Sequence, residues 1–130
     1  MLRMEPYRAH AFLGASMTVG EALPGVRERL EQKALTVSTL RDELAEVEAA
    51  IRRYTDMNKK GLATTQKRRA TNLRRRIAAN TTWAVINLRD DLEAAGRGDL
   101  IEPLTAYAKR CLARPDAYKQ VNRLFEAKND

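Results

Sequence analysis

An apolar seam runs through residues 26–54 with the alternating three-and-four spacing of a coiled coil, and it restricts the fold more than any other feature. Two interleaved heptad positions carry the seam, and they are occupied by Leu30, Val37, Leu44 and Ile51 and by Val26, Lys33, Leu40, Val47 and Tyr54. The pattern predicts a helix over residues 24–57, with Pro24 in the first turn, where proline is tolerated. At 1.5 Å per residue this helix is about 50 Å long.

A second amphipathic segment follows after a short break. It predicts a helix over residues 65–95, whose apolar positions are Ala70, Leu73, Ile77, Ala84, Leu88, Leu92 and Ala95. Residues 58–64 form the predicted turn, in which Gly61 is available for the left-handed conformation that ends a helix. Thr64 or Thr65 is available to cap the second helix. Because short connections join antiparallel neighbours, the two segments predict a long, coiled-coil-like helical hairpin.

Two shorter segments near the C-terminal end predict two further helices. Asp99 and Glu102 resemble a capping box, and they start a predicted helix over residues 99–113. Pro115 starts a last predicted helix over residues 115–128. The apolar face of this last helix consists of Tyr118, Val121, Leu124 and Phe125.

The second long helix becomes apolar on nearly every side between Trp83 and Leu88, so this part of it needs cover from other elements. The two short helices are the available cover, and we expect Trp83 to lie in the core. The predicted fold is therefore all-α, a long antiparallel hairpin with two short C-terminal helices packed at its base. Residues 24–130 form this single helical domain, and residues 1–23 form an N-terminal arm or a short helix.

The composition leaves little room for catalysis or metal binding. The chain has one histidine, His10, and one cysteine, Cys111, which cannot supply a structural zinc site or an internal disulfide. We therefore expect no enzyme activity, no metal and no cofactor. No stretch approaches the roughly 18 apolar residues that cross a bilayer, and the apolar run at residues 11–15 is shorter than a signal sequence requires. These features predict a cytoplasmic protein with no membrane partner.

All of the net positive charge falls on the predicted turn and the second helix. The chain carries a net charge of +7, and residues 57–89 hold nine basic and no acidic residues, which leaves 15 basic against 17 acidic residues elsewhere. The antiparallel register places acids of the first helix beside part of this run, and these are Asp42, Glu43, Glu46 and Glu48. We expect weak cross-helix ion pairs, mainly from Glu46 and Glu48 to residues 74–76. We expect such pairing to leave uncompensated Lys59, Lys60, Lys67, Arg68 and Arg69.

This concentration of charge predicts a non-enzymatic binding protein whose basic hairpin contacts the backbone of duplex nucleic acid or structured RNA without base-specific readout. The candidate anion-binding residues are Lys59, Lys60, Lys67, Arg68, Arg69, Arg74, Arg75 and Arg76. Arginine predominates among them, and its planar guanidinium matches phosphate oxygens in a bidentate manner. Aromatic residues hardly interleave with this cluster, and with Trp83 assigned to the core we do not expect base stacking.

An alternative interpretation is a protein-interaction, assembly or inhibitor protein that docks an acidic or helical protein through the hairpin. The coiled-coil seam is also compatible with a homo-oligomer. Lys33 interrupts the apolar seam, where a charged residue sets register or oligomeric state or marks the point at which the seam leaves its partner. Leu35 and Leu62 have no obvious place in a simple hairpin, so they are candidates for a protein interface if they are exposed.

Overall fold

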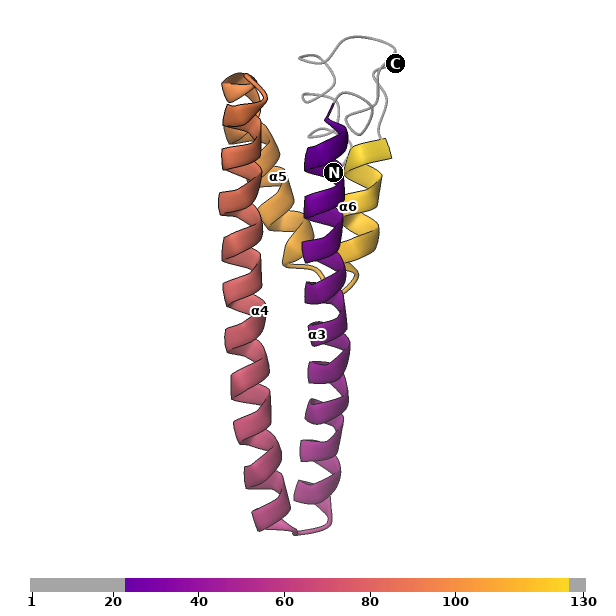
Figure 1. The fold of residues 1–130 in the computed structure, drawn as a ribbon. Coiled ribbons are helices and arrows are strands. Elements are labelled where there is room, and N and C mark those ends of the chain that lie inside the picture. The colour runs from indigo at the N-terminus through magenta and orange to yellow at the C-terminus, as the bar shows by residue number, and fades with distance from the viewer. Residues whose placement is uncertain (1–22, 127–130) are drawn as a thin grey trace.

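The computed structural model describes residues 23–126, which fold into four α-helices and one short 3₁₀ helix. Their bounds are α3 Pro24–Asp56, α4 Lys60–Ala94, η1 Gly98–Leu100, α5 Ile101–Leu112 and α6 Ala117–Glu126. The long helices α3 and α4 run antiparallel from a tight turn, and α5 and α6 lie beside the half of the hairpin farther from that turn (Figure 1). The predicted all-α hairpin with two short helices at its base is therefore confirmed. The N-terminal segment, predicted as an arm or a short helix over residues 1–23, lies outside the described residues except for Leu23.

The seam predicted from the sequence forms the contact between α3 and α4. The buried seam residues of α3 are Val26, Leu30, Val37, Leu40 and Val47, and those of α4 include Ala63, Ala70, Leu73, Ile77 and Ala84. Alanine on α4 allows close approach of the two helices, while Leu44 and Ile51 pack at the edge of the core. In the half of the hairpin near the turn, which we call the arm, this two-helix seam is the whole of the core (Figure 1).

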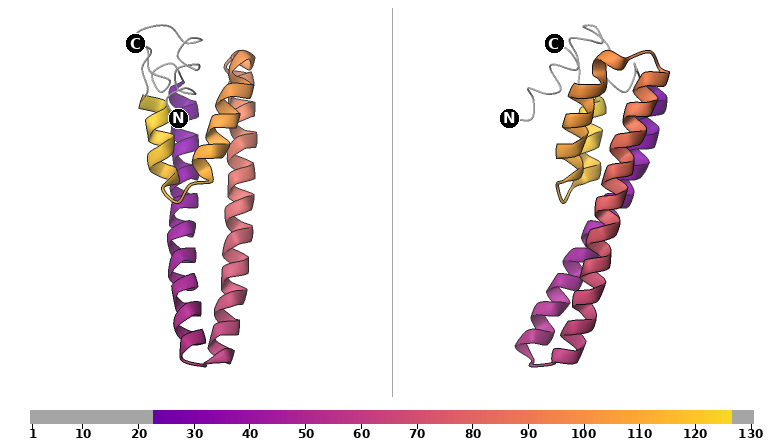
Figure 2. Two further views of the ribbon diagram at one scale, coloured as in Figure 1. Left: turned by 180° about the vertical axis from the view of Figure 1, so that it is seen from behind. Right: turned by 90° about the vertical axis from the view of Figure 1, so that its left-hand side faces the viewer.

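The other half of the hairpin, which we call the head, has a second layer. Helices α5 and α6 pack together on one flank of the hairpin (Figure 2). Large side chains that this layer buries include Leu100, Leu104, Leu112, Val121, Leu124 and Phe125. Two hydrogen bonds attach the layer to α3: Tyr118 N donates to Ser38 Oγ at 2.9 Å, and Arg41 Nη2 donates to the Leu112 carbonyl oxygen at 3.1 Å. The Arg41 guanidinium thus also faces the negative end of the α5 dipole.

The turn of the hairpin differs from its prediction. Asn58, with φ at 57°, is the left-handed residue, and Gly61 lies inside α4, which begins at Lys60. Asparagine tolerates this conformation better than most residues. Asn58 N donates to the Thr55 carbonyl oxygen and Lys59 N to that of Tyr54, which is the hydrogen-bond pattern of a Schellman motif. The turn is therefore shorter than the predicted span of 58–64.

The predicted capping box before α5 is also wrong. Asp99 makes no capping bond, because its carboxylate accepts two hydrogen bonds from the Arg97 guanidinium, at 3.1 and 3.0 Å. The first turn is instead a 3₁₀ helix, η1, from which α5 continues directly. Among the helices of residues 23–126, none combines the length and the apolar character needed to cross a membrane.

Candidate nucleic-acid interface

The basic residues of α4 form three columns along the arm. Residues seven apart in a helix lie nearly above one another, about 10 Å apart along its axis. One column faces away from α3, and the other two lie on its two sides. The column nearest the flank of α5 and α6 contains Lys60, Lys67 and Arg74, the middle column Arg68 and Arg75, and the far column Arg69 and Arg76. All seven side chains are exposed, so α4 presents positive charge over about half of its circumference.

Two of these arginines are paired with carboxylates of α3. Arg74 Nη2 lies 2.9 Å from Glu48 Oε2, which confirms the expected partner, and Arg69 Nη2 lies 2.8 Å from Glu43 Oε2. The expectation that Arg69 would be uncompensated is therefore wrong, because Arg69 and Glu43 occupy facing flank positions of the antiparallel register. Glu46 makes no ion pair with any residue in 23–126. Exposed pairs of this kind contribute about 0–1 kcal/mol each, so they compete weakly with another anion.

The other candidate cations, all on the turn or on α4, have no carboxylate partner within residues 23–126. They are Lys59, Lys60, Lys67, Arg68, Arg75 and Arg76. The predicted site residues are therefore brought together on one continuous surface, and six of the eight are uncompensated within the described chain. This surface lies on the part of the hairpin that α5 and α6 leave uncovered (Figure 1).

One side of the arm is hollowed between α3 and α4. Two adjoining cavities of about 420 and 350 Å³ share Lys67, and together we call them the arm groove. It is lined by Glu48, Ile51, Arg52, Thr55, Asn58, Lys60, Ala63, Thr64, Lys67, Ala70, Thr71 and Arg74. Glu48 is its one carboxylate and is already paired with Arg74, so cations and threonine hydroxyls dominate the lining. Arg52 was not predicted as a site residue, and it reaches this groove from α3, which carries nearly equal numbers of basic and acidic residues.

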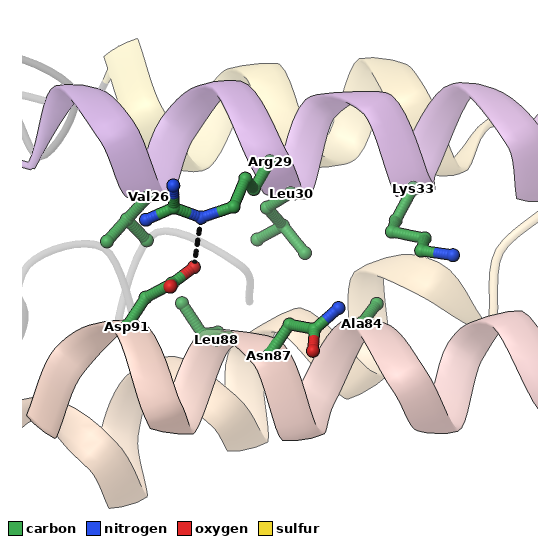
Figure 3. A pocket seen from close by; sticks show the side chains of 8 residues that line it. All are labelled: Val26, Arg29, Leu30, Lys33, Ala84, Asn87, Leu88 and Asp91. Carbon is green, nitrogen blue, oxygen red and sulfur yellow. Dashed lines mark hydrogen bonds and ion pairs between the residues drawn. The ribbon is translucent and has the colours of Figure 1, made fainter. Parts of the chain in front are cut away.

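The interrupted seam position is satisfied within the hairpin. Lys33 Nζ donates to Asn80 Oδ1 at 3.3 Å, and one turn earlier Arg29 Nε lies 2.6 Å from Asp91 Oδ2. Figure 3 shows Arg29 and Lys33 on α3 facing Asn87 and Asp91 on α4. The cavity among them is only about 10 Å³, which is room for one water molecule. The Lys33 ammonium thus has a polar partner across the hairpin, at the seam position that the sequence leaves without an apolar side chain.

Four large apolar side chains of the described chain are exposed. Leu35 and Leu62 are each 47% exposed, and Met57 and Trp83 are each 57% exposed. The prediction that Trp83 lies in the core is wrong, because α5 and α6 cover only one flank of α4. Leu88 faces that covered flank and is buried, whereas Trp83 follows Arg76 by seven residues in the far column. Hydrophobicity alone could not distinguish these two positions, but the heptad register could.

No protein-family model, no curated protein and no solved structure matches this chain. Within residues 23–126, no three histidine, cysteine, aspartate or glutamate side chains are grouped as a metal ion would require. Cys111 is buried on the apolar face of α5, and burial raises the pKa of its thiol to about 11. The basic surface of the arm is therefore the feature from which a function can be argued.

Proposed function

We propose that this chain is a non-enzymatic helical protein whose arm binds the sugar-phosphate backbone of nucleic acid without reading base sequence. One observation carries the proposal: six cations share the exposed surface of the arm, and no carboxylate among residues 23–126 pairs with them. A surface of this kind attracts a polyanion by Coulomb interaction and by release of condensed counterions.

The shape of the arm supports contact with the backbone more than insertion into the major groove of a duplex. One helix with its side chains is about 10 Å across, so the two-helix arm is about 20 Å wide. This exceeds the roughly 12 Å width of the major groove of B-form DNA. The arm groove, in contrast, places Arg52, Lys60 and Lys67 beside threonine hydroxyls, which are groups that bind phosphate oxygens in a sequence-independent manner.

Charge reversal at two unpaired positions tests the proposal. The double variant Lys67→Glu, Arg75→Glu removes two contacts of about 1.5 kcal/mol each, so its affinity for a short duplex or an RNA hairpin falls about a hundredfold. The matched control is Lys119→Glu, Arg123→Glu, which makes the same change in net charge on exposed positions of α6. Equal losses for the two variants would show that only net charge matters, and the proposal would then be rejected.

The second candidate function is docking of a protein, and the exposure of Leu35 and Leu62 favours it. This candidate predicts an assembly, either with an acidic or helical protein or with a second copy of the chain. Light scattering of the purified chain distinguishes the two candidates. A mass above the 14.7 kDa of one chain that reverts with Leu35→Ala or Leu62→Ala supports docking. A single-chain mass together with salt-sensitive binding of nucleic acid supports the first proposal.

A further inference from the structure

Trp83 is the only tryptophan of the chain, and the hairpin leaves its ring more than half exposed. Most of the surface of a tryptophan is apolar, so a side chain that is 57% exposed offers a broad, flat apolar face to a partner. The packing of the head does not require it, because α5 and α6 occupy the opposite flank of α4. Aromatic residues remain scarce near the basic cluster, but the exposed ring of Trp83 makes base stacking possible at this one position.

The surroundings of Trp83 are polar, and the arm continues them with cations. Arg76 lies two helical turns before it in the same column and has no carboxylate partner among the described residues. Asn80 and Asn87 lie one turn to either side, and Asn80 is the residue that holds Lys33. The one unpaired acid of this column is Asp90, two turns beyond Trp83 and away from the arm.

The amide of Asn87 is available in this arrangement. It is half-buried at the edge of the small cavity between Arg29 and Lys33 (Figure 3), and it makes no side-chain hydrogen bond with residues 23–126. The amide of Asn80, in contrast, is used on both sides, because its Nδ2 donates to the Arg76 carbonyl oxygen. Asn87 thus offers a donor and an acceptor within one helical turn of an exposed indole ring.

We infer that Trp83 is a stacking platform for an unpaired nucleotide, and that the arm consequently prefers single-stranded nucleic acid to a duplex. The inference rests on the proposed function, because the strand that leaves the stacked base toward the turn places its phosphates on the cations of the arm, beginning with Arg76. A base in a duplex already stacks on its neighbours and cannot reach the indole without being unpaired. A base in a single strand can, and aromatic stacking accepts every base because each has a π face.

Intrinsic fluorescence tests the inference directly, because any tryptophan signal of this chain comes from Trp83. The full chain is titrated with a short oligothymidylate and, separately, with a blunt duplex of the same length. We expect the single strand to quench the fluorescence in a saturable manner and the duplex to leave it nearly unchanged.

Variants then separate stacking from attraction of charge. Loss of one stacked base lowers affinity about fivefold to a hundredfold, so Trp83→Ala binds the single strand that much more weakly and binds the duplex as before. Trp83→Phe retains most of the affinity. The matched control, Leu35→Ala, truncates a similarly exposed apolar side chain on α3 and changes neither affinity.

The outcomes are distinguishable. If Trp83→Ala leaves single-strand affinity unchanged while Lys67→Glu, Arg75→Glu lowers it, stacking is refuted and the proposed backbone binding stands. If the wild-type chain binds neither probe, both are refuted. Circular dichroism of each variant confirms that the helical content is retained, and an exposed position such as Trp83 is expected to retain it.

Discussion

Two carboxylates of α3, Glu43 and Glu48, determine how much of the positive charge on α4 is available. Each holds one arginine at the surface, so each competes with an incoming phosphate. We predict that Glu48→Gln raises affinity for nucleic acid by up to about fivefold and changes the free energy of unfolding by less than about 1 kcal/mol. Equilibrium binding and urea unfolding measure the two quantities. Glu31→Gln, which breaks the Arg27 pair in the head, is the matched control and should not alter binding.

Cys111 gives a prediction about stability and pH. Desolvation raises the pKa of its thiol from 9.0 to about 11 in the folded chain. The unfolded chain therefore ionises first as the pH rises, so this contribution to stability is complete below pH 9 and is lost toward pH 11. Between about pH 8 and pH 10, the wild type should lose about 1 kcal/mol more stability than Cys111→Ala. Parallel pH profiles in urea unfolding would contradict this.

The turn between α3 and α4 depends on Asn58 and not on Gly61. An added Cβ at Gly61 meets no atom within 4 Å, and the residue lies in the first turn of α4. We therefore predict that Gly61→Ala stabilises the chain by about 0.5–1 kcal/mol, whereas Asn58→Ala destabilises it because of the positive φ. Thermal unfolding measures both changes. A lower melting temperature for Gly61→Ala would place the left-handed residue where the sequence pattern put it.

The elements with the longest periodic pattern are those that the sequence predicts best. Val37 and Leu40 follow from the seam spacing alone, and both are buried. The sequence pattern predicts the left-handed residue of the turn at Gly61, because glycine adopts this conformation most often. The structure has it at Asn58, because local hydrogen bonds of the turn determine the position. Trp83 was misassigned because a helix that is apolar on most sides does not reveal which side its neighbours cover. That information belongs to the packing of α5 and α6, which are remote in sequence.

The two halves of the molecule have different properties. The head has two layers of two helices each and holds most of the buried side chains, while the arm has a single seam and carries the run of uncompensated cations (Figures 1 and 2). The anion-binding candidates were predictable because nine cations without an acid form a run in the sequence. The arm groove was not, since it combines Arg52 of α3 with Lys60 and Lys67 of α4.

The salt dependence of binding by the wild-type chain tests the role of the arm most directly. About six phosphate contacts release enough counterions that affinity for an oligonucleotide falls by about two to three powers of ten between 50 and 200 mM salt. The variant Lys67→Glu, Arg75→Glu should show a shallower dependence, because it makes fewer contacts. Affinity that stays the same across this range of salt would contradict binding through the cations of the arm.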